Sequence, residues 1–248
     1  DIFMKNFFKS NKIIPAPVRK IQRIYRDALI NKNFSGLTNR QTFEKIYNEK
    51  RWGISEENSR RYSSGAGTRT NEIVERYINA VIEHFSSKSH ALNAIDVGCG
   101  DFYVGSHLAK YFKSYTGIDV ASNVIQENRE IYENIKFLCL DACEDTVPDA
   151  EVIFLRQVLQ HLSNAQIHKF LKNIEGKYKY CVITESLSNS FFFSPNKDIA
   201  TGPGIRIHKK SGVVLEEPPF NLKFLTVNTI LEYSEGRELF QTKIYQVK

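Results

Sequence analysis

The sequence predicts an α/β fold in which a parallel sheet is covered by helices on both faces. From Ala91 onward, short apolar runs typical of buried strands alternate with helical patterns. Two further apolar runs flank Ser234–Arg237, which indicates an antiparallel hairpin at the end of the sheet. The 248 residues are 42% hydrophobic and 25% charged, an ordinary globular composition with enough apolar residues for one good core. We therefore expect an α/β domain at 91–248, preceded by a helical extension and lid at 1–90.

The N-terminal extension has the pattern of three helices. We expect them at about 15–31, 39–50 and 71–86. Asn39 is the expected cap of the second helix. The linker that follows it contains the only tryptophan, Trp52, and the small-residue run Tyr62–Thr68. We expect this run to form a lid over the ligand, with Tyr62 on the substrate side.

The α/β part shows five strand-like runs, three helical patterns and the final hairpin. The strands are expected at Leu92–Val97, Tyr115–Val120, Ile135–Leu140, Val152–Leu155 and Tyr180–Thr184, and the hairpin at Leu222–Tyr233 and Glu238–Val247. The helices are expected at about 103–112, 121–133 and 163–174. The stretch Ser186–Phe220 is irregular and rich in Gly, Pro and Phe. Irregular stretches of this length inside a compact domain usually serve function, so we expect a binding loop there.

Basic charge is concentrated at the start of the chain. Residues 1–51 hold twelve Lys/Arg and four Asp/Glu, whereas the remainder holds twenty-two against twenty-four. A basic arm suits nucleic acid, anionic lipid or an acidic partner, although a solvated helix face gives the same pattern. Because the main body is slightly acidic, we expect no nucleic-acid partner, and a peripheral membrane or homo-oligomer contact through the N-terminal helices. With no long apolar run and no signal-peptide core, we expect a cytoplasmic protein, peripheral at the inner membrane face.

Polar residues follow the carboxyl ends of all five predicted parallel strands. They are Asp96–Asp101, Asp119, Asp141–Ala142, Arg156–Gln157 with His161, and Glu185. In open parallel sheets, ligands bind beyond these strand ends. Gly98 and Gly100 permit a sharp turn, and an acidic residue at Asp119 suits two ribose hydroxyls. Tyr103 replaces the third glycine of a dinucleotide fingerprint, and nearby carboxylates disfavour a pyrophosphate. These acidic groups instead suit a cationic ligand with an amino group.

Four motifs at these strand ends, taken together, resemble class I S-adenosyl-L-methionine-dependent methyltransferases. They are Ala94–Phe102, Thr116–Val120, Leu140–Ala142 and Phe154–Leu162. The resemblance covers about residues 91–185. It implies a Rossmann-like seven-stranded sheet with an antiparallel C-terminal hairpin, S-adenosyl-L-methionine as cofactor and S-adenosyl-L-homocysteine as product. The residues it assigns to the cofactor are Asp96, Gly98, Cys99, Gly100, Asp119, Val120, Asp141, Ala142, Arg156 and Gln157.

A narrower resemblance links the chain to small bacterial methyltransferases of surface-polysaccharide and nucleotide-sugar pathways. It is carried by Trp52–Gly53, Ser64–Gly67, Arg156–Leu162 and Pro218–Phe220. It implies O-methylation of a sugar, nucleotide-linked or phosphorylated, in capsule or surface-polysaccharide biosynthesis. Many members carry Asp where this chain has Gln157, so a carboxylate base or metal ligand is missing there. N- or carboxyl methylation of another small metabolite is the alternative within enzymes. A binding module that docks on a membrane or partner through the basic N-terminal helices is the alternative outside them.

A hydroxyl acceptor must lose its proton as it attacks, which requires a nearby base. His161 is the expected base because it follows the fourth strand at the ligand edge, and Glu185 is its rival. Within the long loop, Arg206 and His208 are the expected contacts of an anionic acceptor. No dense Asp/Glu/His cluster or paired cysteine motif is present, so no metal is expected.

Overall fold

The computed structural model describes residues 32–53, 60–65 and 72–247. Residues Asp1–Ser35 and Gly36–Lys248 form two compact units, and the second holds every element named here. In chain order these are α3 (Asn39–Asn48), α4 (Glu72–Phe85), η2 (Ser89–Ala91), β1 (Asn93–Val97), α5 (Tyr103–Ala109), β2 (Ser114–Asp119), α6 (Ser122–Ile131), β3 (Lys136–Cys139), β4 (Val152–Arg156), η3 (Leu159–His161), α7 (Asn164–Ile174), β5 (Tyr180–Ser188), η4 (Arg206–Lys209), β6 (Thr226–Glu235) and β7 (Glu238–Gln246). The helix predicted at about 15–31 lies outside the described residues, and the division predicted at residue 90 stays a prediction.

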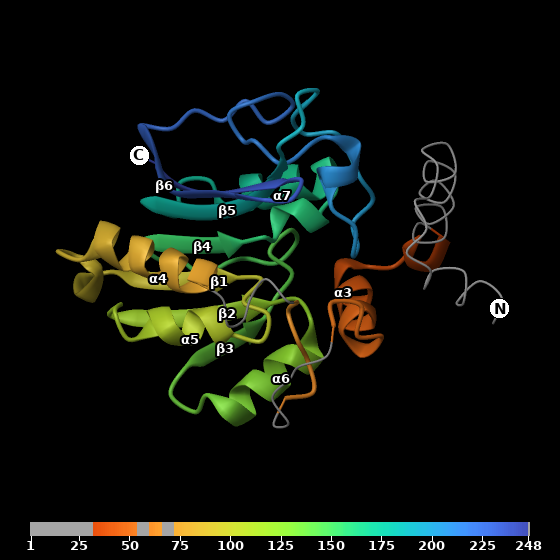
Figure 1. Cartoon of the computed structure of the whole chain (residues 1–248). Helices are drawn as coiled ribbons and strands as arrows, with labels where there is room; N and C mark the ends of the chain where they lie inside the picture. Colours follow the sequence, from red (N-terminus) through yellow and green to blue (C-terminus); the bar gives the residue numbers. More distant parts are fainter. Residues whose placement is uncertain (1–31, 54–59, 66–71, 248) are drawn as a thin grey trace. The chain divides into compact units, whose positions relative to one another are not determined.

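The strands form a seven-stranded sheet in the order β3-β2-β1-β4-β5-β7-β6 (Figure 1). The first five strands along the chain run parallel, whereas β7 runs antiparallel between β5 and β6. From β1 the chain builds outward to β2 and β3 on one side, and then returns to build β4 and β5 on the other. The strand order therefore reverses between β1 and β4, the place where open sheets of this type bind ligands. The predicted parallel α/β sheet with a final antiparallel hairpin is confirmed.

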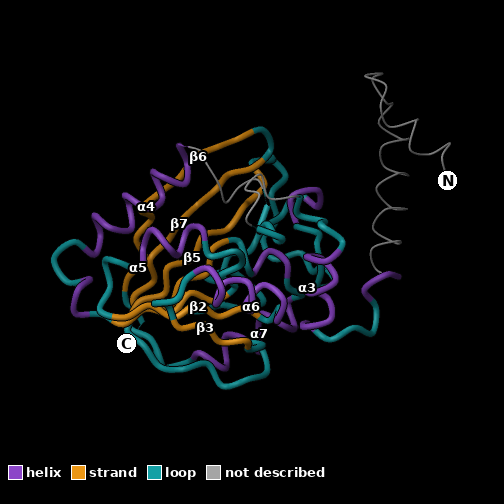
Figure 2. Tube along the Cα trace, turned by 90° about the horizontal axis from the view of Figure 1, so that it is seen from below, coloured by secondary structure: helices purple, strands orange, loops and turns teal. Residues whose placement is uncertain are grey.

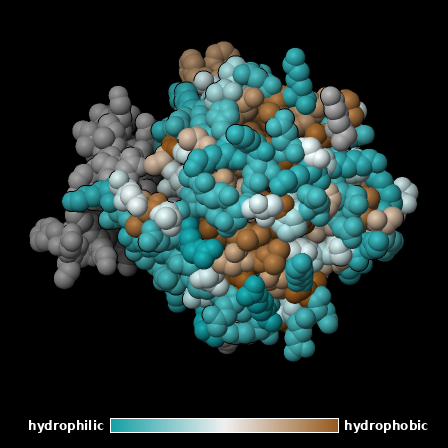
Figure 3. Space-filling view, turned by 180° about the vertical axis from the view of Figure 1, so that it is seen from behind, coloured by the Kyte–Doolittle hydropathy of each residue, from teal (hydrophilic) through white to brown (hydrophobic). Residues whose placement is uncertain are grey.

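Both faces of the sheet are buried, which explains why its strands read as short continuous apolar runs. On one face, the apolar side chains of α7 and of residues 213–224 pack against inward residues such as Ile95 and Ile153. On the other face, α4, α5 and α6 cover neighbours in the same strands, such as Ala94 and Phe154. Figure 2 shows α4 and α7 on opposite sides of one twisted layer of strands. Figure 3 shows hydrophobic residues of the outer surface in separate patches among hydrophilic side chains.

Several elements differ from their predicted form. β6 begins at Thr226, not Leu222, and α5 ends at Ala109, not at about residue 112. α3 is capped by Thr38, not Asn39: the Thr38 hydroxyl accepts from the Gln41 amide at 3.2 Å, and the Gln41 side chain accepts from the Thr38 amide at 3.0 Å. β5 continues to Ser188 because its last residues pair with β7, in register with Glu238. The irregular stretch therefore begins at Asn189.

The turn after β1 depends on a glycine at position 98. Gly98 has φ +70°, and a Cβ there would lie 2.5 Å from a Val158 methyl carbon in the turn after β4. A side chain at this position would therefore meet both backbone strain and a steric clash. The glycine lets the turns after the two central strands touch, and these turns form the floor of the site described below.

We predict that Gly98→Ala destabilises the protein more than Gly176→Ala does. Gly176 has a similar φ of +74°, but a Cβ there would have nothing within 4 Å, so this position measures backbone strain alone. We expect a cost of about 1 kcal/mol at Gly176 and about 1–3 kcal/mol more at Gly98 because of overpacking. Urea unfolding of both variants measures the difference. Equal losses of stability would show that contact with Val158 does not constrain the turn.

Candidate functional site

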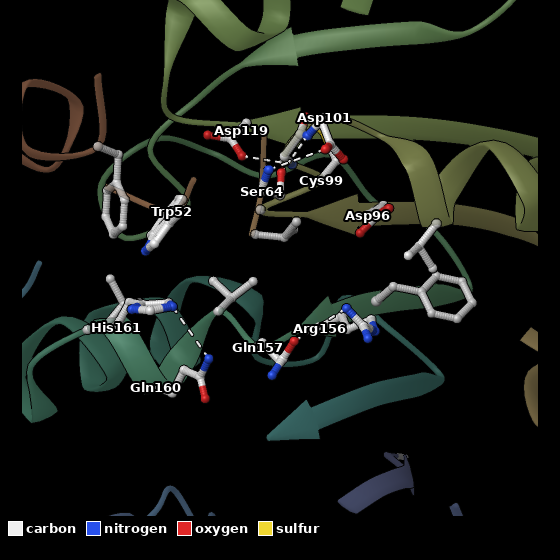
Figure 4. Close-up of a pocket in the computed structure, with 18 of the residues that line it drawn as sticks. Trp52, Ser64, Asp96, Cys99, Asp101, Asp119, Arg156, Gln157, Gln160 and His161 are labelled. Atoms are coloured by element: carbon white, nitrogen blue, oxygen red, sulfur yellow. Dashed lines mark hydrogen bonds between the residues drawn. The ribbon is translucent and has the colours of Figure 1, made fainter. Parts of the chain in front are cut away.

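A cavity of about 770 Å³ lies at the carboxyl ends of the parallel strands. Its walls come from the turns after β1 to β4, from α3 and α4, and from the turn between β6 and β7. It is lined by the ten residues assigned above to a cofactor: Asp96, Gly98, Cys99, Gly100, Asp119, Val120, Asp141, Ala142, Arg156 and Gln157. His161 also lines it, but Tyr62, Glu185, Arg206 and His208 do not. Figure 4 shows acidic side chains on one side of the opening, facing Arg156, Gln157, Gln160 and His161 on the other.

Asp119, at the end of β2, joins the turns that follow β1 and β2. Its carboxylate accepts from the Gly100 amide at 3.0 Å and from the Ala121 amide at 2.9 Å. The side chain is only 6% exposed, and burial raises the pKa of Asp119 while these amides oppose the rise. Because a carboxylate has about four acceptor positions, Asp119 retains capacity to accept from ligand hydroxyl groups.

Asp96 supplies a second buried carboxylate to the same wall. It accepts from the Tyr115 hydroxyl at 3.2 Å. Burial raises the pKa of Asp96 to about 7, with the charge of Asp119 adding to the rise and Tyr115 and Arg156 opposing it. Two carboxylates so close together favour a positively charged ligand, because a cation would relieve both their desolvation and their mutual repulsion.

A third acid, Asp101, holds the residues that we call the clasp segment, 60–65. The Asp101 carboxylate accepts from the Ser64 amide at 3.2 Å, and the Asp101 amide donates to the Ser64 hydroxyl at 2.7 Å. The Glu127 carboxylate accepts from the Arg61 amide at 2.6 Å. At Gly100, which has φ +53°, a Cβ would lie 2.1 Å from the Ser64 hydroxyl oxygen. The clasp segment therefore rests directly on the glycine turn and contributes Ser64 to the cavity wall.

The clasp segment corresponds to the beginning of the predicted lid, but Tyr62 does not face the substrate side as expected. Its ring packs edge-on against Tyr47, with centroids 6.1 Å apart, and its amide donates to Glu127 at 3.3 Å. Tyr62 therefore packs against Tyr47 behind the cavity wall and does not line the cavity. Residues 66–68 of the predicted lid lie outside the described part of the chain.

His161, the predicted base, is half-buried at the end of η3. Its Nδ1 lies 3.3 Å from the Gly204 carbonyl oxygen and its Nε2 lies 3.4 Å from the Gln160 amide nitrogen. Donation from Nδ1 to that carbonyl leaves Nε2 as the acceptor. Burial lowers the pKa of His161 to about 4, although hydrogen bonding to backbone carbonyls opposes the shift. The imidazole is therefore neutral at physiological pH and can accept a proton.

An aromatic wall stands beside His161 and was not predicted as part of the site. The Trp52 ring lies 5.1 Å from the His161 ring and packs edge-on against Tyr47, also at 5.1 Å. Asn39, on α3, donates to the Asp141 carboxylate at 3.2 Å and lines the same end. Trp52 thus both packs against Tyr47 and lines the cavity. Its being the only tryptophan in the chain was the signal available in the sequence.

Charged and aromatic groups from distant parts of the chain also line the cavity. The Arg156 guanidinium lies 5.4 Å from the Tyr77 ring centre, close enough for a cation–π contact with α4. The turn after β6 adds Glu235, Arg237 and Glu238 to the lining. In the sequence this turn is visible only as a charged hairpin connection, with nothing to indicate that it reaches the strand ends.

Arg206 does not contact the cavity, contrary to the prediction. It is 1% exposed, because its guanidinium donates hydrogen bonds to acceptors within the fold. It donates to the backbone oxygens of Leu159, Gln160, Leu162 and Lys197 and to the Asn164 side chain. Arg206 therefore anchors the long loop to η3 and α7 and has no donors left for an acceptor phosphate. His208, in the same short helix, also lies outside the lining.

Glu185, the rival base, also lies away from the cavity. It is 4% exposed and accepts from the Leu159 amide at 3.0 Å, which fixes the start of η3. Burial raises the pKa of Glu185 to about 8, opposed by the charge of Arg206. Its role in the structure is to position the turn that carries His161. Among the described residues, no group of three or more His, Cys, Asp and Glu side chains could hold a metal ion.

Comparison with known proteins supports the fold and the kind of domain that the sequence motifs predict. Residues 94–179 match the family model described as a methyltransferase domain. Residues 94–179 therefore carry a methyltransferase domain, and the chain has the fold of S-adenosyl-L-methionine-dependent methyltransferases. No curated protein matches this methyltransferase chain. The helices of its described residues include none long and apolar enough to cross a membrane.

Solved methyltransferases share this fold at low sequence identity. The N-methyltransferase NodS from Bradyrhizobium japonicum WM9, in complex with S-adenosyl-L-homocysteine, is 13% identical, with a TM-score of 0.57 over 85% of this chain and 99% of that one. The N-terminal domain of EvdMO1, in the presence of S-adenosyl-L-homocysteine and D-fucose, is 11% identical, with a TM-score of 0.52 over 86% and 99%. Magnesium protoporphyrin IX methyltransferase from Synechocystis PCC 6803 is 12% identical, with a TM-score of 0.52 over 86% and 99%.

The residues of this methyltransferase fit S-adenosyl-L-methionine as its cofactor. The glycine turn leaves room that a Cβ at position 98 or 100 would fill. Asp119 can accept from hydroxyl groups, and the buried carboxylates of Asp96 and Asp101, 8% and 2% exposed, favour a cation. Burial and these acids raise the pKa of the Cys99 thiol well above its usual value, so Cys99 contributes a neutral side chain to the turn.

We predict that affinity for S-adenosyl-L-methionine rises with pH up to about 7 and then levels off. Below pH 7 Asp96 is protonated, because its pKa is about 7, and its attraction for a cationic ligand is lost. The loss approaches tenfold per pH unit below the pKa if the cation needs the ionised form. Asp96→Asn removes this dependence. Calorimetric titration from pH 5.5 to 8.5 measures it, as an order-of-magnitude test of the linkage.

S-adenosyl-L-homocysteine is the matched control ligand, because it lacks the sulfonium charge and should show a shallower dependence on pH. Thermal unfolding of Asp96→Asn checks that the variant is folded. Parallel pH profiles for the wild type and Asp96→Asn would remove Asp96 as the source of the dependence.

Proposed function

We propose that this methyltransferase O-methylates a sugar, nucleotide-linked or phosphorylated, in bacterial surface-polysaccharide biosynthesis. The observation that supports it best is the mixed lining of the cavity. The buried acids of β1 and β2 face Arg156, Gln157 and His161 across the opening, and Tyr77 and the β6–β7 turn also line it. A cavity of this size and mixed lining has room for a cofactor and a polar acceptor side by side. The narrower sequence resemblance supports the pathway, in a protein acting in the cytoplasm.

In this proposal the acids and the glycine turn hold the cofactor. Gly98 to Gly100 line its methionine part, and Asp119 accepts from both ribose hydroxyls. Val120, Asp141 and Ala142 border the adenine, and the backbone at Arg156 and Gln157 lies near the amino group. When bound, S-adenosyl-L-methionine supplies a methyl group already activated by the positive sulfur.

The chain's contribution to the chemistry is alignment and removal of one proton. His161 lines the cavity, and its Nε2 is unprotonated at physiological pH. A hydroxyl becomes strongly acidic as its oxygen gains a methyl group, so a base with a pKa of about 4 can still receive its proton. Trp52 and the Gly204 carbonyl hold the imidazole in place.

Recognition of an acidic acceptor falls to Arg156 and Arg237 in place of Arg206. Both line the cavity, whereas the guanidinium of Arg206 donates its hydrogen bonds inside the fold. Glu235 and Glu238 add acceptors suited to sugar hydroxyls, and Phe240 adds an aromatic face. This combination of cations, carboxylates and rings supports a polyhydroxylated ligand that carries an anionic group.

We predict that S-adenosyl-L-homocysteine binds the purified protein and that NAD does not, in parallel calorimetric titrations. Asp119→Ala should weaken S-adenosyl-L-homocysteine binding by about 100-fold, because two charge-assisted hydrogen bonds are lost. Methyl transfer to a panel of nucleotide-sugars and sugar phosphates then tests the acceptor. Binding of NAD alone would contradict the cofactor, and methylation confined to amines or carboxylates would contradict the O-methyl acceptor.

We predict that His161→Ala lowers kcat by about 100-fold and leaves the affinity for S-adenosyl-L-homocysteine nearly unchanged. His90→Ala is the matched control, because His90 is exposed in η2 and lies outside the cavity lining. At saturating cofactor, kcat of the wild type should fall only as pH approaches the His161 pKa of about 4. An unchanged kcat, or a loss confined to cofactor affinity, would exclude His161 as the base.

A further inference from the structure

Two phenylalanines in the turn after β5 stand almost wholly in solvent. Phe191 is 96% exposed and Phe192 is 68% exposed, and their rings lie edge to face with centroids 5.4 Å apart. Each ring leaves a large apolar surface in water at a cost that burial would remove. Single exposed apolar residues are common on proteins, but two adjacent aromatic rings pointing outward call for an explanation.

The backbone holds this pair in a defined turn. The Phe193 amide donates to the Ser190 carbonyl oxygen at 2.9 Å, and the Phe192 amide lies 3.3 Å from the Ser190 hydroxyl oxygen. The next residue, Ser194, donates from its amide to the Lys210 carbonyl oxygen at 3.0 Å. The turn is therefore tied both to itself and to the segment after η4, and the two rings are presented by an ordered scaffold.

Exposed cations accompany the rings. The Lys210 ammonium lies 4.6 Å from the Phe192 ring centre. Lys197 and Lys209 are exposed on the same loop, where the Lys197 ammonium donates to the Lys209 carbonyl oxygen at 3.0 Å. Asp198 is the acidic residue between them, so cations outnumber acids here. Aromatic rings flanked by lysines are suited to an anionic membrane surface, with the rings at the hydrocarbon boundary and the ammonium groups among the headgroups.

The surroundings of the pair favour a bilayer over a protein partner. The other large apolar side chains exposed among the described residues are Leu37, Ile131, Leu225 and Val227. Leu225 and Val227 flank Thr226, which pairs with Gln246 at the end of the sheet where β5 begins, away from the turn after β5. A stable protein interface needs about 800 Å² from each partner, whereas a bilayer needs no complementary surface around the two rings.

We propose that Phe191 and Phe192, with Lys197, Lys209 and Lys210, form a membrane-docking site for anionic lipid bilayers. The site is distinct from the basic N-terminal arm. Its position also bears on the acceptor: the Asn189 amide donates to the Arg237 carbonyl oxygen at 3.1 Å, and the Asn189 side chain donates to the Gly236 carbonyl oxygen at 2.9 Å. Gly236 and Arg237 line the cavity, so docking brings this part of the cavity wall close to the membrane. Resting on the proposed function, this favours a sugar acceptor carried on a lipid.

Cosedimentation of the full chain with extruded vesicles tests the docking site. The vesicles contain phosphatidylcholine alone or equal parts of phosphatidylcholine and phosphatidylglycerol. We expect binding to the anionic vesicles that weakens by roughly tenfold for each ring removed, and so by roughly a hundredfold in Phe191→Ser/Phe192→Ser. Lys209→Glu/Lys210→Glu should also weaken vesicle binding, and the loss should be larger at low salt than at high salt.

The matched control is Leu225→Ser/Val227→Ser, which removes two exposed apolar side chains at the other end of the sheet and should bind as the wild type does. Every variant keeps the N-terminal arm, so wild-type binding by Phe191→Ser/Phe192→Ser would overturn the proposal in favour of the arm. A change of oligomeric state in that variant, with no vesicle dependence, would overturn it in favour of a second copy. Affinity for S-adenosyl-L-homocysteine, measured without vesicles, should be equal in all variants, so failure of methyl transfer and failure of docking are read separately.

Discussion

The carboxylate of Asp119 is the contact on which the rest of the site depends. By accepting hydrogen bonds from the Gly100 and Ala121 amides, it fixes the turns after two adjacent parallel strands with a single side chain. The position of the Gly100 turn then decides where Ser64 can rest, and Ser64 with Asp101 brings the clasp segment onto the strand ends. The wall of the cavity is thus built outward from one buried acid. Its desolvation is offset by backbone amides and leaves a negative potential for a ligand to neutralise.

The long segment between β5 and β6 is organised by its own buried charge. Arg206 donates hydrogen bonds to backbone oxygens of η3 and of the loop. Glu185 accepts from the Leu159 amide and so fixes the start of η3. Together they hold the helical turn that ends in His161. A charged pair that the sequence places near the ligand therefore acts as scaffolding, because each group finds several partners inside the fold that it could not exchange for a ligand without a large desolvation cost.

The sequence predicted the sheet well, and it predicted that the ten residues assigned to a cofactor would meet at one edge of that sheet, because both follow from local patterns. Short apolar runs mark the strands, and the polar residues just after them must meet at one edge of a parallel sheet. Partners cannot be predicted in this way: nothing near Arg206 in the chain shows that five acceptors surround it. The position of Tyr62 could not be predicted for the same reason, since its packing on Tyr47 is a tertiary contact. Tyr77 and Glu235 join the cavity lining only through the packing of α4 and of the hairpin turn, which no local pattern indicates.

The antiparallel position of β7 has a consequence for how the protein forms during synthesis. The turns after β1 to β4 supply most of the cavity wall, whereas the lining residues at 235–240 come with the final hairpin. Until β7 emerges, β5 is an edge strand with unpaired backbone groups along its length. We expect a nascent chain to complete the strand ends that carry the glycine turn and the buried acids first, and the part of the cavity wall formed by the hairpin last. Glu238 and Phe240, which line the cavity, then also pair with β5 and close its edge against aggregation.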